Sequence, residues 1–156
     1  MRSWVQLLLV VGMVSGAGCS SNRREAPANL IPVAGIVILE SEPAANVTLH
    51  FIPAPGTNSQ GGYAVTDLSG HYRVKHLSNA ENADGLEKGA YRITFSKLAS
   101  PDGSPIPEGR TAADVGAVES MPPHLSVLNE ENPLFVLEVD APKTDANFDL
   151  KKKPGR

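Results

Sequence analysis

Short runs in which apolar and polar residues alternate one by one dominate the sequence from Ile31 onward. In Val47 to Phe51 and in Tyr91 to Phe95, every second residue is apolar. Strict alternation places the apolar residues on one face of a β-strand, whereas a helix repeats them three and four positions apart. Because no helical stripe of useful length follows Ile31, the pattern predicts an all-β domain.

Seven such runs are separated by Gly, Pro, Asn and Asp, the residues that favour turns. Each run offers one apolar face, so two sheets must stack to bury these faces. The sequence therefore predicts a seven-stranded β-sandwich. Its strands are expected near Val33–Leu39, Val47–Phe51, Tyr63–Thr66, Tyr72–Val74, Tyr91–Phe95, Phe135–Val139 and Phe148–Leu150.

Three residues are predicted to have structural roles in turns. The run from Asp67 to Gly70 is typical of a tight turn, in which the aspartate caps backbone N–H groups and the glycine adopts a positive φ. Gly89, just before a predicted strand, is interpreted as a second turn glycine. A Ca²⁺ ion at Asp67 is the alternative, but Ca²⁺ takes six to eight oxygen ligands and this turn supplies few.

One long connection, Pro101 to Pro123, is rich in Pro, Gly and Ala, and it has room for a short helical turn at Thr111–Val118. Loops of this length are uncommon in compact domains and are often functional. A carbohydrate- or peptide-binding role for this loop is therefore one hypothesis. The loop has no aromatic residue on which a sugar ring could stack, which weakens that hypothesis.

The N-terminus has the order of a secretory signal: Arg2, then eleven mostly apolar residues at Trp4–Val14, then small residues at 15–18 that lead into Cys19. The apolar run is too short to cross a membrane as a helix, which needs about 20 residues. We expect residues 1–18 to form a signal helix that is removed after export. Residues 19–30 are predicted to be a polar tether.

The residues before Cys19 resemble the lipobox of bacterial lipoproteins. Ala17 and Gly18 match its two small positions, whereas Gly16 stands where leucine is usual. The resemblance implies cleavage before Cys19 and a lipid on its sulfur, and Ser20 in the next position implies sorting to the outer membrane. The alternative is an ordinary secretory signal that is cut near Ala17 and leaves a free thiol.

The charge balance argues against a nucleic-acid partner. The formal net charge is −3, and removal of residues 1–18 takes away only Arg2, which leaves −4. Nucleic-acid-binding domains present a basic face. The basic residues that close the chain, at 152–156 and Lys151 before them, are interpreted as a solvated tail, with a membrane-surface or cell-wall contact as the alternative.

Six segments follow one another in an informative order: Val33–Leu39, Glu42–Pro53, Thr66–Tyr72, Leu86–Phe95, Met121–Leu125 and Asn147–Leu150. In this order they resemble the carboxypeptidase regulatory-like domains, although those domains more often have an aromatic residue at the position of Leu125. The resemblance covers about Ile31 to Lys151. It implies a transthyretin-like, Greek-key sandwich that serves as an accessory module and not as a catalyst.

No pattern for catalysis, a metal or a cofactor is found. There is no G-x-S-x-G elbow, and an acylated Cys19 leaves no free thiol. The histidines lack the close pairing of zinc ligands and are interpreted as exposed strand and loop residues. A catalytic triad whose residues are brought together only by the fold is the alternative that the sequence does not exclude, because triads are defined by geometry. The four histidines are His50, His71, His76 and His124.

The sequence thus predicts an exported, lipid-anchored protein of the cell envelope with a non-catalytic domain. Its expected partners are the membrane, through Cys19, and other envelope proteins. No cofactor or metal is expected, and the sequence leaves the oligomeric state open. A binding module that uses the 101–123 loop is the second hypothesis, and an enzyme is the third.

Overall fold

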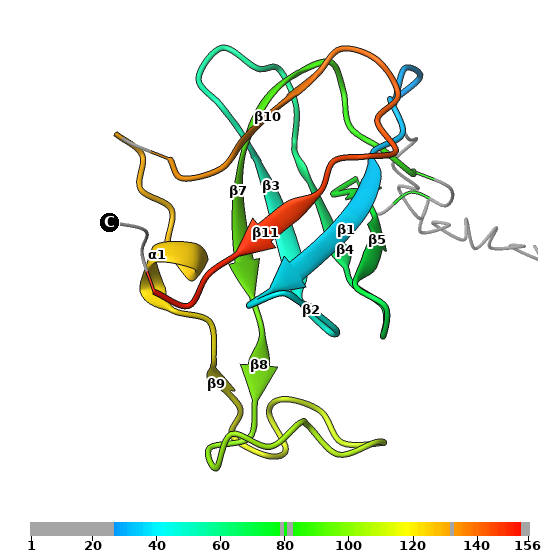
Figure 1. The fold of residues 1–156 in the computed structure, drawn as a ribbon. Helices are drawn as coiled ribbons and strands as arrows, with labels where there is room; N and C mark the ends of the chain where they lie inside the picture. The colour runs from blue at the N-terminus through cyan, green and yellow to red at the C-terminus, as the bar shows by residue number, and fades with distance from the viewer. Residues whose placement is uncertain (1–26, 79, 81–82, 132, 154–156) are drawn as a thin grey trace, which may run out of the picture.

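The computed structural model describes residues 27–78, 80, 83–131 and 133–153. The expected signal helix, Cys19 and most of the expected tether lie outside these residues. Within them the chain forms eleven strands and one four-residue helix (Figure 1). The all-β prediction is therefore confirmed. In the described ranges, no helix is long and apolar enough to cross a membrane.

The first sheet is built around β1 (Ala34–Leu39). The first half of β1 pairs with β5 (His71–Arg73) and its second half with β2 (Glu42–Pro43), both antiparallel. Along its other edge β1 pairs with β11 (Phe148–Leu150), and this pair is parallel. The first and last long elements of the described domain are thus neighbours in one sheet.

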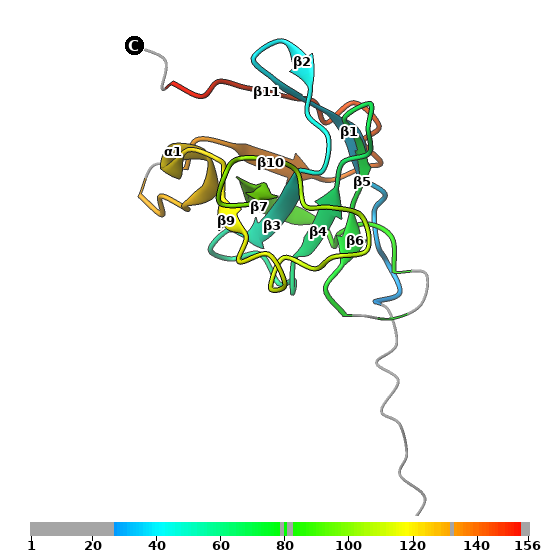
Figure 2. The same cartoon turned by 90° about the horizontal axis from the view of Figure 1, so that it is seen from below.

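The second sheet has the order β10-β7-β3-β4-β6, and all of its pairs are antiparallel. Its centre is the pair of β3 with β7, the longest strand, while β10 and β6 form the edges. Figure 2 shows β11 and β1 lying above β10, β7 and β3, so the two sheets form two layers. The bounds are β3 (Thr48–Pro53), β4 (Gly62–Val65), β6 (Lys75–His76), β7 (Gly89–Ser96) and β10 (Val136–Val139).

The core lies between these sheets and follows the alternation in the sequence. Leu49 and Tyr91, expected to point inward, have no exposed surface, and Phe135 is partly buried against them. Phe135 packs edge-on against Phe95 and Phe148, with ring centroids 5.1 Å and 5.8 Å away. The side chains that close the core from both layers are Val33, Val37, Val47, Phe51, Tyr72, Val74, Ile93, Val139 and Leu150.

The expected long loop is not a loop throughout. Two short strands, β8 (Leu98–Ala99) and β9 (Val118–Glu119), pair with each other and form an arm that leaves the sandwich (Figure 1). The predicted helical turn at 111–118 is instead a run of turns, closed by a bond from the Ala117 N–H to the carbonyl of Ala112. The helix α1 (Pro123–Ser126) begins where the expected loop ends.

Candidate functional site

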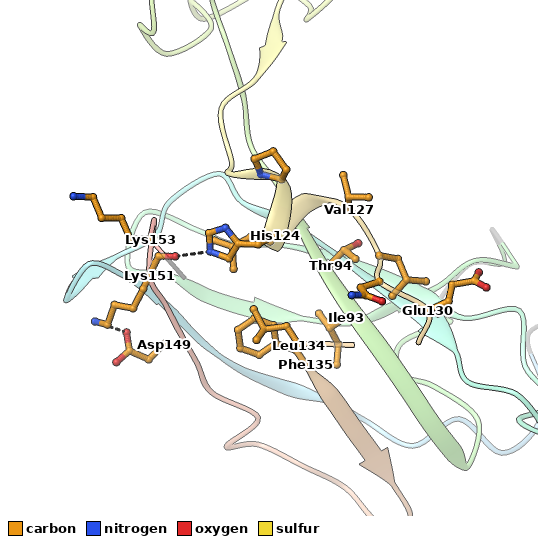
Figure 3. Close-up of a pocket in the computed structure, with 14 residues that line it drawn as sticks. Ile93, Thr94, His124, Val127, Glu130, Leu134, Phe135, Asp149, Lys151 and Lys153 are labelled. Carbon is orange, nitrogen blue, oxygen red and sulfur yellow. Dashed lines mark hydrogen bonds and ion pairs between the residues drawn. The ribbon is translucent and has the colours of Figure 1, made fainter. Parts of the chain in front are cut away.

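A pocket of about 860 Å³ opens beside α1, between the segment 127–135, β7 and the end of β11 (Figure 3). Its volume falls in the range of about 300–1,000 Å³ that is usual for small-ligand sites. The residues that line it come from four separate parts of the chain. They are Ile93, Thr94, Pro123, His124, Leu125, Val127, Leu128, Asn129, Glu130, Leu134, Phe135, Asp149, Lys151 and Lys153.

Two prolines determine where α1, the helix that forms one wall of the pocket, begins. Pro122 has the extended φ of −58° and ψ of 146°, and Pro123 occupies the first helical turn, where a missing N–H costs nothing. Leu125 is 2% exposed and fixes the helix to the core. At Val127 the backbone becomes extended, and its N–H bonds to the Pro123 carbonyl. The chain therefore leaves the helix and lines the pocket on its way to β10.

The floor of the pocket is formed by buried residues of β7. Ile93 and Thr94 on β7 are buried, and the Ile93 N–H bonds to the carbonyl of Phe135 at 3.0 Å. At the rim, Val127 is 66% exposed and Leu134 is 61% exposed. These large aliphatic side chains expose apolar surface to water at the edge of the pocket. Covering that surface with an apolar ligand is favourable, because it removes the surface from water.

The polar groups of the pocket are separated by charge. His124, Lys151 and Lys153 lie together on one side in Figure 3, and Glu130 lies on the other side. The Nζ atom of Lys151 is 3.0 Å from the Oδ1 atom of Asp149, so Lys151 is already paired. A shallower depression of about 500 Å³, lined by Glu40 and the lysines at 151–153, adjoins the basic side.

A hydrogen bond from His124 links α1 to Lys151, the residue that follows β11. Its Nε2 atom lies 2.9 Å from the carbonyl oxygen of Lys151, so Nε2 carries the proton and donates it. The partner is a main-chain carbonyl, where a general base in a catalytic triad would have a carboxylate. Within the described ranges, no group of three or more His, Cys, Asp or Glu residues is placed to hold a metal ion.

The interpretation of all four histidines as exposed is wrong for His76. This residue is 2% exposed, whereas His50 and His71 are exposed. Its Nε2 atom lies 3.0 Å from the carboxylate of Glu87, and its Nδ1 atom accepts the N–H of Ser78 at 3.1 Å. The imidazole is therefore the Nε2–H tautomer, and both of its nitrogens are occupied.

The same carboxylate also accepts a hydrogen bond from the hydroxyl of Ser59. A histidine, an acid and a serine thus meet, but in an order unlike a hydrolytic triad. In a triad the imidazole stands between hydroxyl and carboxylate and takes the hydroxyl proton. Here the carboxylate of Glu87 stands in the middle, and Nδ1 of His76 is bound to a backbone N–H. The arrangement fastens the loop at 59–61 to β6 and to the segment before β7.

Of the predicted turn residues, Asp67 and Gly70 lie together before β5. The Oδ1 atom of Asp67 accepts the N–H groups of Ser69 at 2.8 Å and His71 at 3.0 Å. Gly70 has a φ of +77°, and a Cβ there would come 2.5 Å from the carbonyl oxygen of Val37. Both the dihedral angle and the close approach require glycine.

Gly89 is the first residue of β7 and does not lie inside a turn. A Cβ at this position would meet the Cγ2 atom of Thr57 at 2.3 Å. The hydroxyl of Thr57 accepts the N–H of Ala90 and donates to its carbonyl, both at 3.1 Å. Glycine at 89 therefore lets the 57–59 loop approach the strand. Cys19, the remaining predicted site residue, lies outside the described residues.

The pocket was not anticipated by the sequence-based interpretation, which placed possible binding in the 101–123 loop. Only Pro123 of that loop lines the pocket. One signal was present: Val127 and Leu134 are large apolar residues outside the alternating runs that build the sandwich core. His124 was a second signal. It stands beside Leu125, an apolar residue that is expected to be buried, so the histidine lies close to the core.

Comparison with known proteins does not assign the chain to a family. No protein-family model matches the sequence, and no curated protein matches it. Among solved structures, the chain is similar to a 9R-lipoxygenase from Cyanothece PCC8801, with 16% sequence identity and a TM-score of 0.36. The alignment covers 84% of this chain and 18% of the lipoxygenase chain. A likeness this weak carries no argument about fold or activity.

Proposed function

We propose that this chain is an exported lipoprotein of the bacterial cell envelope, whose non-catalytic β-sandwich binds another envelope component. The anchor part of the proposal depends on the small residues that lead into Cys19 after a short apolar run. Several acyl chains hold a protein at a membrane firmly, because each buried CH₂ contributes about 0.8 kcal/mol. Sorting to the outer membrane is part of the proposal.

The fold proposed for the domain is the seven-stranded, transthyretin-like Greek key of carboxypeptidase regulatory-like modules. The support is the strand order: β5-β1-β11 in one layer and β4-β3-β7-β10 in the other. These seven strands have three or more residues, and β2, β6, β8 and β9 have two each. Among these seven strands the chain crosses between the layers four times, after β1, β4, β5 and β10, as in sandwiches with Greek-key connections.

The single observation that carries the binding role is the make-up of the pocket beside α1. It is concave, aliphatic side chains form part of its lining, and polar and charged groups form the rest, which are the features of a small-ligand site. Its histidine, His124, donates to a main-chain carbonyl. The pocket therefore has the groups to hold and orient a ligand, while a nucleophile paired with a base is not among them.

The pocket, and not the 101–123 loop, is the part of the domain that we propose to bind. Most of that loop is exposed on the β8–β9 arm, and it contains no aromatic residue. A carbohydrate site in the loop therefore has no stacking surface. The arm remains available as a contact for other envelope proteins.

Mass spectrometry of the protein from membranes tests the anchor. The expected mature chain begins at Cys19 and carries the mass of a diacylglycerol modification. Cys19→Ala is expected to leave the signal uncleaved or the protein mislocalised, with the sandwich intact by circular dichroism. Ser20→Ala, the neighbouring control, is expected to be processed like the natural chain. Full processing of Cys19→Ala together with its partition into membranes would contradict the proposed anchor.

A further inference from the structure

We infer that the pocket beside α1 binds a single aliphatic chain that ends in a carboxylate, as in a free fatty acid. The inference rests on the proposed binding role of the domain but not on acylation of Cys19. Its basis is the combination of an open, mainly apolar pocket with charges of opposite sign at its two sides. Each of these features restricts the chemistry of the ligand separately.

The lining favours an aliphatic chain over a ring. The apolar contacts come from Ile, Leu and Val side chains, with one aromatic residue, Phe135. The Phe135 ring is engaged with Phe95 and Phe148 at interplanar angles of 80° and 90°, so it is part of the core and does not form an open stacking platform. The other planar ring of the lining, the imidazole of His124, is held by its hydrogen bond to the Lys151 carbonyl. A flexible hydrocarbon chain fits the aliphatic part of the lining without a stacking partner.

The rim shows where such a chain would gain most. Val127 and Leu134 are more than half exposed, although they border a recess with buried aliphatic side chains at its floor. A chain lying between the rim and Ile93 would remove both side chains from water. Burial of apolar surface is the main source of affinity for ligands of this kind.

The charges set the direction of the ligand. On the basic side, Asp149 pairs with Lys151, and this leaves Lys153 as a pocket cation with no ion pair among the described residues. Lys152, which lines the adjoining depression, adds a further positive charge. Glu130 on the opposite side repels an anion. A carboxylate head is therefore expected at Lys153, with the hydrocarbon tail extending toward Val127.

Photolabelling in membranes tests this assignment with the full-length protein. The probes are a diazirine-bearing fatty acid and the matched fatty alcohol, each added to membranes that contain the protein. Digestion and mass spectrometry are expected to map the acid label to residues 121–135 and 148–153. Excess unlabelled myristate is expected to remove this label. Labelling spread evenly over the domain, or unchanged by myristate, would overturn the inference.

Two variants separate the aliphatic and the ionic parts of the site. Leu134→Asp is expected to lower labelling by acid and alcohol alike, by about tenfold, because a charge enters the apolar rim. Leu68→Asp is its control, since Leu68 is 84% exposed and lies outside the pocket. Lys153→Glu is expected to lower acid labelling about fivefold and leave the alcohol unchanged. Lys88→Glu is the matched charge control.

The results also separate this inference from the proposed anchor. The acyl modification of Cys19 is read from the mass of the same sample and does not depend on labelling. Equal losses for acid and alcohol in Lys153→Glu would show that the head group is not recognised as a carboxylate. Unchanged labelling in Leu134→Asp would show that the chain does not occupy the pocket, which also overturns the inference.

Discussion

The hydroxyl of Tyr72 on β5 donates a hydrogen bond of 2.5 Å to the main-chain carbonyl of Ala146, 74 positions later. Both groups are buried, so neither has water as a substitute partner. Tyr91 makes a similar bond, of 2.7 Å, to the carbonyl of Glu87, four positions before it. Both tyrosines thus place their rings in the core and bind the backbone through their hydroxyls.

Tyr72→Phe is expected to lower the free energy of unfolding by about 1–3 kcal/mol. The variant keeps the ring contacts with Phe51 and Phe148 but leaves the Ala146 carbonyl without a donor. Urea denaturation followed by fluorescence or circular dichroism measures the change. Tyr63→Phe, on the half-buried outer side of β4, is the control and is expected to change stability little. Equal effects of the two substitutions would contradict a special role for Tyr72.

The same tyrosine gives a prediction for alkaline pH. Burial raises the pKa of the Tyr72 hydroxyl far above its ordinary value of 10.0. A group whose folded pKa is raised contributes its full stability below the unfolded pKa, and that contribution is lost as the pH rises toward the folded pKa. The natural chain is therefore expected to lose stability above about pH 10 more steeply than Tyr72→Phe. Denaturation curves of both proteins across this range measure the difference, and parallel slopes would refute it.

Thr66→Val is expected to cost about 1–3 kcal/mol although the two side chains have nearly the same shape. The Thr66 hydroxyl accepts the N–H of Val47 at 2.8 Å and donates to the carbonyl of Ala44, and all three groups are buried. Valine would leave both backbone groups unpaired. Thr48→Val on β3 is the matched control, and denaturant unfolding measures both variants. A neutral Thr66→Val would mean that water reaches these groups.

The carboxylate of Glu119 is expected to hold the β8–β9 arm in a pH-dependent way. Burial acts to raise its pKa, but hydrogen bonds from the Ser96 hydroxyl and from the N–H groups of Lys97 and Met121 outweigh burial and lower it. Because the folded pKa is lowered, the stabilisation is present above the unfolded pKa of 4.5 and is lost as the pH falls through the folded value.

Amide chemical shifts and hydrogen exchange at Lys97 and Met121, followed against pH, measure this effect. The natural chain is expected to show a transition below about pH 4.5, and Glu119→Gln is expected to show none and to exchange faster at neutral pH. Glu138→Gln, an exposed position on β10, serves as the control. A transition that persists in Glu119→Gln would assign the effect to another carboxylate.

For His76 the structure predicts a single neutral tautomer. Nitrogen-15 spectra at neutral pH are expected to show a proton on Nε2 and none on Nδ1, because Nδ1 accepts the Ser78 N–H and Nε2 donates to Glu87. Exposed His50 is the internal reference and is expected to exchange between tautomers. Detection of the Nδ1–H form at His76 would show that the cluster is arranged differently.

The alternation of side chains was sufficient to predict the all-β fold, because the inward residues of β3, Leu49 and Phe51, stand two positions apart and can be read directly. The alternation also contains a clue that the interpretation of His76 overlooked. Tyr72, Val74 and His76 share the same period, so the histidine must point inward with the other two. An inward histidine then needs an acceptor, which Glu87 supplies.

Other features had no local signal. The strand β9 has two residues, and its partner β8 lies nineteen positions earlier, so no periodicity can develop in either. The helix α1 has four residues, which is too short for the repeat of apolar positions that indicates a helix. The pocket lies between β7, α1, residues 127–130 and 134–135, and the end of β11, and only tertiary packing brings these parts together.

The parallel pairing of β1 with β11 has a consequence for biogenesis. One edge of β1 pairs with residues that lie more than a hundred positions later in the chain, as the bond from the Ile36 N–H to Asn147 shows. During synthesis from the N-terminus, this edge is therefore unpaired until those residues have been made. Contacts of such long sequence separation form slowly. The first sheet is therefore completed only after residues 148–150 have been made, so the sandwich cannot close around an N-terminal half alone.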